Sequence, residues 1–457
     1  MAISDVSRAP AGTVRAPLSF NQEFLCLFDK GNNAGPFGPR YTLADGWRVR
    51  GRLDPAVLRA ALADVVERHE ALRTALSRAE GDRHQRVDPA SPPELDVRDL
   101  PGTAPGDRDH RAQEFLNEVE ATPVPVDRLP LLHAVLGRFA DDDAVLVVNT
   151  HHVATDGWSM QLIIRDLAEC YAARVQGRAP RLPETYPYRE FTAWEQENLT
   201  EAGVAGSREY WRDRLRGGEI LALPADRPKP PDGEMVAAVH RFAVDPETSA
   251  ATAAYAAAMR CSPFMVLVAA WYVTLHQLTG RTDLTFPTIT SNRGRPRFQE
   301  TVGSFFNFVP LRTDLAGCAT FRDVTGRART TCLEAYANDI PFAYVAGDTP
   351  ELMRQFADET GAVFGFQVSQ FPPVLDGGDH AGLRVTRISR TLSQDVSSHI
   401  PDGALWDLEV EPGGAIVGSL KYDSRTFDRS TIVARAEHML RVLRAGVTGP
   451  DAPLGEL

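Results

Sequence analysis

Four consecutive apolar residues, Val145-Leu146-Val147-Val148, predict a strand that is buried on both faces. They lie in the second of two apolar segments, Leu131–Phe139 and Ala144–Thr150, which flank an acidic turn and predict a hairpin or two adjacent strands. Ser159–Val175 follows, with apolar residues at helical spacing. A strand covered on both sides needs packed layers against each face. We therefore expect an α/β or α+β architecture.

The chain has 457 residues, which is enough for about two to four compact units. A Pro-, Arg- and Gly-rich stretch from 177 to 235 predicts a linker, and residues 1–17 predict a loose leader. We predict two units, 1–180 and 181–457, with a cleft between them. Further helices are expected at Leu53–Thr74, Thr248–Met259, Pro263–Leu278 and Arg429–Arg444, and further strands at Leu284–Thr290, Phe305–Leu311, Val363–Phe371, Trp406–Val410 and Ile416–Tyr422.

Composition and charge argue against nucleic-acid binding, membrane insertion and secretion. The formal net charge is −12, which opposes nucleic-acid binding because phosphate contacts need a basic field. No apolar run approaches the roughly 18 residues of a membrane helix. The N-terminus lacks the basic and apolar segments of a secretory signal, and the five cysteines are scattered without a Cys-x-x-Cys pair. We expect a cytoplasmic protein with no membrane and no nucleic-acid partner.

The string His151-His152-Val153-Ala154-Thr155-Asp156-Gly157-Trp158-Ser159 lies between the buried strand and the helix. Adjacent residues at a strand end point to opposite faces, so one histidine faces a cleft and the other lies in the interior. A neutral imidazole suits general base catalysis. Asp156 can orient the loop through a buried ion pair, and Gly157 allows close approach of a substrate. The N-terminus of the following helix suits a developing oxyanion.

Two alternatives apply to this string. An isolated His-x-x-x-Asp pattern is more often structural than catalytic. A metal site is disfavoured because adjacent histidines diverge and no third ligand is apparent, so we predict no metal. The complete string after a buried strand is much more specific than either fragment.

The string resembles the core motif of nonribosomal peptide synthetase condensation domains, in the chloramphenicol acetyltransferase-like superfamily. The resemblance runs from about Pro17 to about Val447, and further segments occur in the family's order. These segments are Leu18-Ser19-Phe20-Asn21-Gln22, Arg68-His69-Glu70-Ala71-Leu72-Arg73-Thr74, Tyr188-Arg189-Glu190-Phe191-Thr192-Ala193-Trp194, Val302-Gly303-Ser304-Phe305-Phe306-Asn307 and Asn338-Asp339-Ile340-Pro341-Phe342.

The resemblance implies two acetyltransferase-like halves in a V, with a tunnel between them. A separate acyl or peptidyl carrier protein would present an acyl thioester on its phosphopantetheine arm, and an alcohol or amine acceptor would enter from the other side. No bound cofactor is expected.

The resemblance also assigns roles to residues. His152 would face the tunnel and act with Asp156 and Gly157 as the catalytic group. His151, Arg68 and Arg293 would support the site. Asp156 would pair with Arg293 of Ser291-Asn292-Arg293, although Arg295 and Arg297 follow and a plain surface arginine is the alternative.

Some positions depart from the family pattern. Phe308 stands where the family usually has threonine, Ala337-Asn338 replaces the usual His-Gln, and the segment 366–371 only loosely resembles the seventh motif. We hypothesise a bulkier, more apolar acceptor than an aminoacyl carrier, with drift in core packing as the alternative. The residues expected to border the tunnel are Trp158, Asn307, Phe308, Ser369 and Gln370.

The sequence ends at Leu457 and contains no Leu-Gly-Gly-x-Ser phosphopantetheine site. We therefore expect a free-standing condensation enzyme that recruits its carrier in trans. It most resembles those of enediyne antitumour antibiotic pathways, where a β-tyrosine-type acid is esterified to an enediyne alcohol. The alternatives are a non-catalytic recruitment module, an epimerisation domain and a coenzyme A-dependent acyltransferase. Recruitment modules lose the second histidine and the glycine, both present here, and the Asp-Phe-Gly-Trp-Gly motif of the plant-type acyltransferases does not occur.

Overall fold

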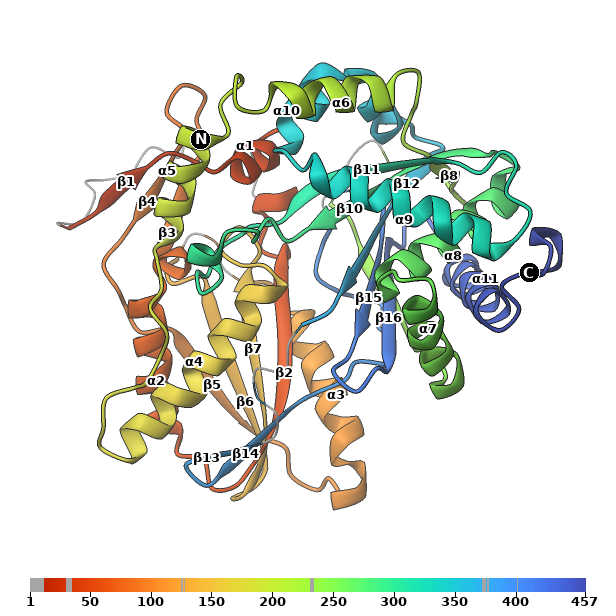
Figure 1. The fold of residues 1–457 in the computed structure, drawn as a ribbon. Coiled ribbons are helices and arrows are strands. Elements are labelled where there is room, and N and C mark those ends of the chain that lie inside the picture. Colours follow the sequence, from red (N-terminus) through yellow and green to blue (C-terminus); the bar gives the residue numbers. More distant parts are fainter. Residues whose placement is uncertain are drawn as a thin grey trace. The chain divides into compact units, whose positions relative to one another are not determined.

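The computed structural model describes residues 12–29, 35–124, 126, 128–230, 234–371, 375, 378–400 and 402–457. The chain forms two compact units (Figure 1). The first comprises Met1–Thr200, Ser291–Phe305 and Pro373–Ile388, and the second comprises Glu201–Thr290, Phe306–Pro372 and Ser389–Leu457. The first unit therefore extends beyond the predicted boundary at 180, and it also takes in two segments from the later part of the chain.

The first unit is built on a six-stranded sheet with the strand order β13-β14-β2-β7-β6-β5. The β5–β6 pair is parallel and the other neighbours are antiparallel. Strands β13 and β14 come from the segment after residue 373: β14 pairs with β2, and β13 pairs with β14 at the edge of the sheet. The strands are β2 (Thr42–Arg50), β5 (Glu94–Asp99), β6 (Leu132–Ala140), β7 (Asp143–His151), β13 (Asp379–His380) and β14 (Leu383–Arg387).

Strand β7 is buried on both faces, as its apolar run predicts. Leu146 and Val148 pack in one cluster with α2 (Pro55–Arg68) and α4 (Gly157–Val175). Val145 and Val147 pack in another cluster with α3 (Arg108–Glu120). Successive strand residues point to opposite faces, so a continuous apolar run serves two cores at once. Helices therefore cover both sides of this sheet.

A second, three-stranded sheet in this unit has the order β1-β4-β3. The predicted helix Leu53–Thr74 is too long at its C-terminal end: α2 stops at Arg68, where His69 adopts extended backbone. Its N-terminus is as predicted, with Asp54 capping and Pro55 in the first turn. The remaining elements are β1 (Val14–Ala16), α1 (Phe20–Cys26), β3 (Thr74–Ser77), β4 (His84–Val87), α5 (Tyr188–Asn198) and the 3₁₀ helices η1 (Gly35–Phe37), η2 (Glu70–Arg73), η3 (Pro105–Asp107) and η4 (Pro296–Phe298).

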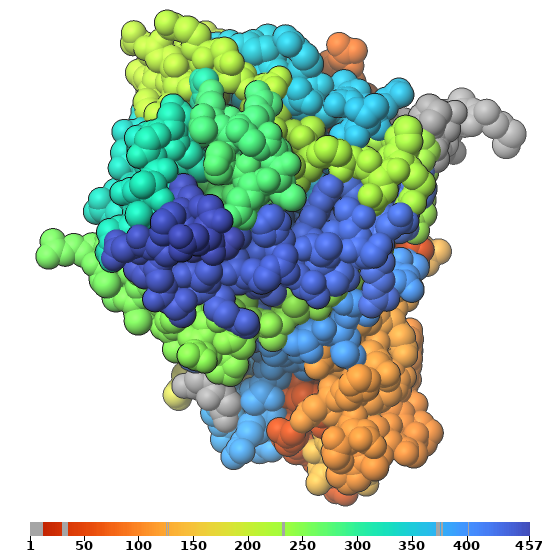
Figure 2. Space-filling model, turned by 90° about the vertical axis from the view of Figure 1, so that its right-hand side faces the viewer, coloured from red at the N-terminus to blue at the C-terminus, as the bar shows by residue number. Residues whose placement is uncertain are grey.

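The second unit contains a five-stranded sheet with the order β8-β12-β15-β16-β9 and a two-stranded sheet formed by β10 and β11. Helix α8 is buried along most of its length, and its Trp271 stacks on Phe366 of β12. The C-terminal residues, dark blue in Figure 2, lie on the surface of this unit. The strands are β8 (Ala222–Pro224), β9 (Ala237–Ala243), β10 (Asp283–Thr290), β11 (Asn307–Asp314), β12 (Gly361–Ser369), β15 (Ala404–Val410) and β16 (Ile416–Asp423). The helices are α6 (Ala205–Leu215), α7 (Pro246–Ala258), α8 (Pro263–Thr279), α9 (Phe321–Ala337), α10 (Phe342–Asp348), α11 (Arg429–Thr448), η5 (Pro350–Ala357) and η6 (Leu454–Glu456).

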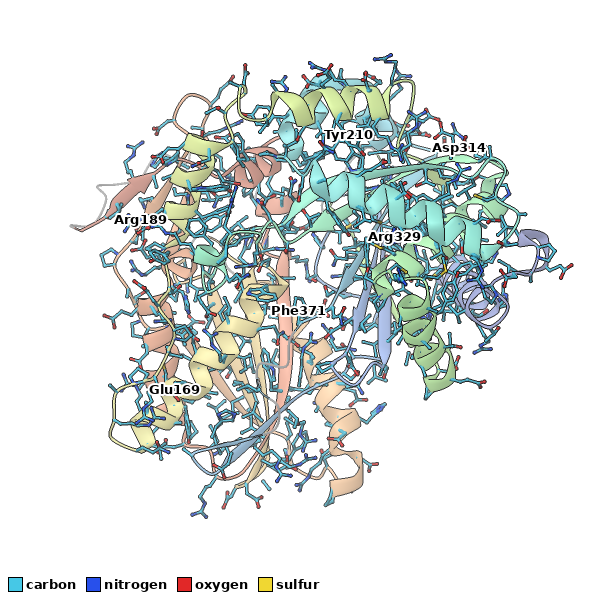
Figure 3. The ribbon with its side chains drawn as sticks, viewed as in Figure 1. Glu169, Arg189, Tyr210, Asp314, Arg329 and Phe371 are labelled. Atoms are coloured by element: carbon cyan, nitrogen blue, oxygen red, sulfur yellow. The ribbon has the colours of Figure 1, made fainter. Side chains whose placement is uncertain are left out.

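The stretch predicted as a linker, 177–235, carries the chain from the first unit to the second at Thr200–Glu201, and it also forms regular elements. It contains α5, α6 and β8, and the labels of Arg189 and Tyr210 mark the two helices in Figure 3. Its prolines flank these helices instead of interrupting them: Pro187 is the N-cap of α5, which buries Tyr188 and Phe191. Residues 231–233 of this stretch and 1–11 of the predicted leader lie outside the described residues, while 14–16 form β1.

Within the described part of the chain, no single helix is long and apolar enough to cross a membrane. By length and composition alone, α7 and α8 pass that test as a pair, with a bend of 106° between them.

Candidate active site

His151 ends β7 and points into the interior of the first unit, as predicted for one of the two histidines. It is 1% exposed, and its Nε2 lies 3.0 Å from the carbonyl oxygen of Gly38. A carbonyl oxygen only accepts, so Nε2 carries the hydrogen and Nδ1 can accept from the Val153 amide at 3.3 Å. Burial lowers the pKa of His151 to about 4. The imidazole is therefore neutral at physiological pH and holds the loop in place.

His152 is half-buried and is oriented by its own loop. Its Nδ1 lies 2.8 Å from the carbonyl oxygen of Thr155, so Nδ1 carries the hydrogen and donates it. In this tautomer Nε2 is the nitrogen that can accept a proton, as a general base requires. The backbone amide of His152 donates to the carbonyl oxygen of Tyr41 at 2.9 Å.

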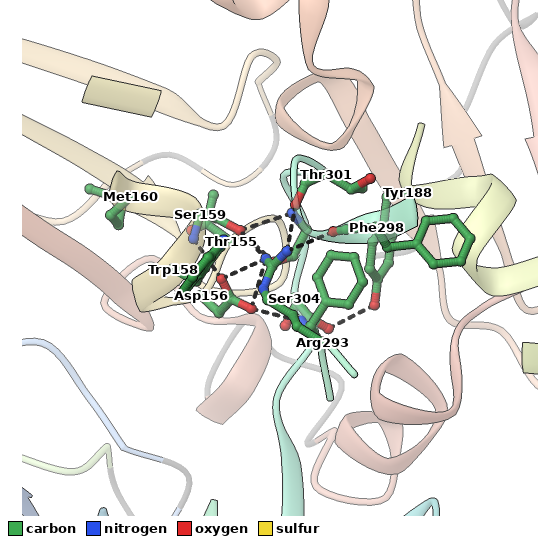
Figure 4. A network of polar contacts seen from close by, with 12 residues as sticks. Thr155, Asp156, Trp158, Ser159, Met160, Tyr188, Arg293, Phe298, Thr301 and Ser304 are labelled. Carbon is green, nitrogen blue, oxygen red and sulfur yellow. Dashed lines mark hydrogen bonds and ion pairs between the residues drawn. The ribbon is translucent and has the colours of Figure 1, made fainter. Parts of the chain in front are cut away.

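Asp156 and Arg293 form the ion pair that the family resemblance implies (Figure 4). Nη2 of Arg293 lies 3.0 Å from Oδ1 and 3.1 Å from Oδ2 of Asp156. Arg293 is only 6% exposed, whereas Arg295 and Arg297 are exposed. The alternative of a plain surface arginine is therefore wrong, and Arg293 is a buried part of the first unit.

The guanidinium of Arg293 also stabilises the segment 291–305, in which it lies. Its Nη1 donates to the carbonyl oxygens of Phe298 at 3.1 Å and Thr301 at 2.8 Å, and its Nη2 donates to Oγ of Ser159 at 2.9 Å. The guanidinium carbon lies 3.9 Å from the centre of the Phe305 ring. One side chain thus joins the 291–305 segment to the N-terminus of α4.

Asp156 is the N-cap of α4, and its Oδ1 accepts from the Ser159 amide at 2.7 Å while its Oδ2 accepts from the Phe305 amide at 3.3 Å. These contacts match the predicted role of Asp156 in orienting the loop, and its assignment to the catalytic group stays a prediction. The predicted oxyanion site at this helix N-terminus is disfavoured, because a carboxylate already occupies the positive end of the helix. Gly157 is the first residue of α4 and has helical backbone, so close approach of a substrate remains its predicted role.

Motifs from distant parts of the sequence meet beside this network. The Tyr188 hydroxyl lies 2.7 Å from the Ser304 carbonyl oxygen and 2.9 Å from Oγ of Ser19. A Cβ added to Gly303 would lie 2.0 Å from the Tyr188 ring, so only glycine fits there. The segments around Ser19, Tyr188 and Gly303 are therefore packed together within the first unit.

Arg68 supports α4 from a different side. Its Nε donates to the fully buried carboxylate of Asp166 at 2.8 Å, and His69 Nε2 lies 2.9 Å from the same oxygen. Arg165 adds a third contact to Asp166 and pairs with Glu300 at 2.7 Å. Burial alone would raise the pKa of Asp166, but the hydrogen bond from His69 and the charge of Arg165 outweigh burial and hold this pKa below its ordinary value. The predicted supporting role of Arg68 thus has a physical basis in anchoring α4.

The residues predicted to border a tunnel belong to different units. Trp158 lies in the first unit, and its indole nitrogen donates to the Gln299 carbonyl oxygen at 2.9 Å. In the second unit, Phe308 on β11 contacts Phe306 and Phe342, Ser369 ends β12, and Gln370 is exposed. A substrate-contacting role for these residues stays a prediction.

Asn307 has both ends of its amide engaged within the second unit. Nδ2 donates to Oδ1 of Asp339 and to the Ile340 carbonyl oxygen, each at 2.7 Å, and Oδ1 accepts from the Phe342 amide at 3.0 Å. Burial raises the pKa of Asp339, which also accepts from Thr290. These contacts give Asn307 and the segment Asn338–Phe342 a structural role, because they join β11 to the N-terminus of α10.

Sequence reasoning missed several residues that organise the site: Tyr41, Thr155, Ser159 and Glu195. Thr155 and Ser159 lie inside the histidine string. The sequence does not reveal that the Thr155 carbonyl oxygen contacts His152 or that the Ser159 hydroxyl contacts Arg293. Tyr41 is brought to His152 only by the pairing of β2 with β7, which aligns Thr42 with His151. Among the described residues, no group of three His, Cys, Asp or Glu side chains is placed to hold a metal ion.

Glu195 on α5 is a buried carboxyl group near the 291–305 segment. It is 1% exposed, and it accepts from the Phe20 amide at 3.3 Å and from Nδ2 of Asn292 at 3.5 Å. Burial raises its pKa to about 8. Asn292, which precedes Arg293, has a left-handed φ of 48°. Glu195 thus helps to hold the backbone that presents Arg293.

The raised pKa of Glu195 predicts a pH-dependent stability. Between its ordinary value of 4.5 and about 8, the folded chain holds a proton that the unfolded chain releases. The free energy of unfolding should therefore fall as the pH rises through this window, by about 2–4 kcal/mol between pH 5 and pH 8. Urea unfolding at several pH values should show that Glu195→Gln removes this component. The exposed neighbour Glu197 provides the control, and an unchanged pH dependence in Glu195→Gln would contradict the prediction.

Comparison with known proteins identifies relatives of this chain. The family described as Condensation domain matches residues 16–457. One of the linear gramicidin synthase proteins of Brevibacillus parabrevis is 31% identical over 96% of this chain, and the chain spans only 6% of that protein's length. The crystal structure of the SgcC5 protein from Streptomyces globisporus, in complex with (R)-(-)-1-(2-naphthyl)-1,2-ethanediol and sucrose, is 46% identical, with a TM-score of 0.92. It covers 96% of this chain and 100% of its own.

A second solved relative is the X-domain from teicoplanin biosynthesis, which is 26% identical. Its structure has a TM-score of 0.77 and covers 100% of this chain and 99% of its own, and it has also been solved in complex with OxyB. The matches extend over nearly all of the sequence and agree with the α/β fold predicted for it. This chain belongs to the condensation domain family.

Proposed function

We propose that this protein transfers an acyl group from the thioester of a separate carrier protein to an alcohol or an amine in natural-product biosynthesis. The observation that carries the proposal is the tautomer of His152, in which Nδ1 donates to the Thr155 carbonyl oxygen and Nε2 can accept a proton. The donor would be an aminoacyl or β-amino acyl group, of the β-tyrosine type by resemblance to enediyne pathway enzymes.

The chemistry requires little from the protein beyond positioning and one base. The acceptor hydroxyl attacks the thioester carbonyl carbon while its proton passes to Nε2 of His152. The tetrahedral intermediate then expels the phosphopantetheine thiolate, which takes the proton from Nε2. Holding both reactants together can contribute about 7–11 kcal/mol, and a general base adds about 10²–10⁴-fold.

Two observations support an alcohol acceptor with an aromatic part. The SgcC5 protein was solved with an aryl vicinal diol. Phe308, at a position where the family usually has threonine, contacts Phe306 and Phe342 in this chain. The surroundings of position 308 are therefore aromatic. We therefore propose an aryl diol as the simplest acceptor surrogate.

The test is incubation of the purified protein with a carrier loaded with an aromatic β-amino acid. One sample receives an aryl 1,2-ethanediol, one the matching amino alcohol, and one the coenzyme A thioester in place of the carrier. Mass spectrometry should detect an ester that depends on the carrier. Amide product alone would contradict the alcohol acceptor. Turnover with the coenzyme A thioester alone would contradict a carrier protein as the donor.

A non-catalytic recruitment module is the second candidate, because a relative of similar length, the X-domain, forms a complex with OxyB. It predicts tight binding of a carrier or of another protein without product in any of these samples. The presence of His152 in a base-competent tautomer is the observation that favours the enzyme.

A further inference from the structure

Tyr41 lies directly before β2 and is 3% exposed. The antiparallel register of β2 and β7 pairs Thr42 with His151, so Tyr41 comes opposite His152. The carbonyl oxygen of Tyr41 accepts from the His152 amide at 2.9 Å. Backbone pairing thus places the Tyr41 side chain beside the histidine pair.

The Tyr41 ring contacts both histidines, with a different geometry for each. It stacks on the His152 imidazole with ring centres 4.8 Å apart and planes inclined by 18°. It meets the His151 ring edge-on, at 6.1 Å and 70°. Both arrangements are among the favourable geometries for aromatic pairs.

The stack and the Thr155 carbonyl oxygen constrain His152 in complementary ways. The hydrogen bond at Nδ1 determines which nitrogen faces the loop, but a single hydrogen bond leaves the plane of the ring free to tilt. The Tyr41 face restricts that tilt. Together, the two contacts determine the direction in which Nε2 points.

We infer that Tyr41 is a positioning residue for His152, and that its aromatic face, not its hydroxyl group, aims Nε2 at the acceptor. This inference rests on the proposed function for its effect on catalysis. A base displaced from the proton that it removes loses rate steeply, because small misplacements of a reacting group cost up to about 10²-fold. The structure therefore assigns Tyr41 an effect on kcat rather than on substrate binding.

The first test compares Tyr41→Phe, which keeps the ring, with Tyr41→Leu, which removes it. Tyr41→Leu should lower kcat for ester formation about 10- to 100-fold with KM for the loaded carrier within about threefold, and Tyr41→Phe should retain at least about half of the wild-type kcat. In the His152→Ala background, Tyr41→Leu should cost no further activity. An equal loss with and without His152, or a Tyr41→Phe variant as slow as Tyr41→Leu, would overturn the inference.

Phe115→Leu is the matched control, because Phe115 on α3 is a buried aromatic residue that packs in the cluster of Val145, near the opposite end of β7 from His151. It loses a ring of the same size away from His152, so its kcat should stay near that of the wild type. Thermal unfolding of each variant identifies any loss caused by misfolding, and Tyr41→Met is the substitute if the leucine variant does not fold.

The second test does not depend on turnover. In protein carrying isotope-labelled histidine, the NMR signal of His152 is identified by its absence in His152→Ala. The ring current of Tyr41 should shield the His152 ring protons, so Tyr41→Leu should move their signals downfield and Tyr41→Phe should leave them nearly in place. This shift in a protein that makes no product would contradict the proposed function but retain the positioning contact. Unmoved signals would overturn the contact itself.

Discussion

Replacing His152 by alanine should slow ester formation by about 10²- to 10⁴-fold, the usual contribution of a general base. The alcohol acceptor is a poor nucleophile until its proton is removed, and Nε2 of His152 is the nitrogen that can take this proton when Nδ1 donates to the Thr155 carbonyl oxygen. Initial rates with a carrier-bound aromatic β-amino acid and an aryl diol measure the effect directly.

The same substitution should have a smaller effect on amide formation. An amine with a pKa near 8 is partly neutral at neutral pH and attacks a thioester with little assistance. The matching amino alcohol therefore provides an internal comparison in which only the nucleophile changes. Equal and small losses with both acceptors would show that His152 positions substrate instead of acting as a base.

Two controls separate this effect from general damage. His110→Ala removes an exposed histidine on α3 and should leave both rates unchanged. Thermal unfolding of His152→Ala should show a loss on the order of 1 kcal/mol, because the hydrogen bond to Thr155 and the stack on Tyr41 are removed while the buried cores stay intact. A much larger loss of stability would mean that the rates report folding.

Arg293→Met should reduce the stability of the first unit by about 3–5 kcal/mol, the range observed when one member of a buried ion pair is removed. The substitution leaves the Asp156 carboxylate, 7% exposed, without its cation. It also removes donors from Ser159 and from the carbonyl oxygens of Phe298 and Thr301. Hydrogen exchange of peptides from β7 and α4 reports on the opening of this unit separately from the second.

The pairing itself is tested by the double variant Asp156→Asn with Arg293→Met. The double variant buries no unpaired charge, so it should be more stable than Arg293→Met alone. The loss of stability in the double variant should therefore be smaller than the sum of the two single losses. Arg297→Met is the matched control: Arg297 is exposed and pairs with Glu190, so its loss should cost no more than about 1 kcal/mol. Equal costs at 293 and 297 would contradict the structural role assigned to Arg293.

Secondary structure was predictable wherever the signal was local. The apolar run of β7, the helical spacing of α4 and the Asp54-Pro55 cap all lie within a few residues, and each predicted the observed element. The crossing between the two units lies within 177–235, as its proline density predicts, but proline density does not reveal the helices α5 and α6 in this stretch. Helix α2 was predicted too long because nothing near His69 in the sequence reveals that its ring is bonded to Asp166.

The sequence by itself determined the family and identified the histidine string, because the string's chemistry lies in adjacent residues whose strand and helix follow from local patterning. Only the tertiary structure decided which groups hold that string. Asp156 and Arg293 are 137 positions apart, and the resemblance could imply their pairing but not the contacts to Ser159, Phe298 and Thr301. Tyr41 reaches His152 only through the register of β2 and β7. Such contacts join residues that are far apart in the sequence. They form only when strands and helices pack against one another, and local patterning does not show how these elements pack.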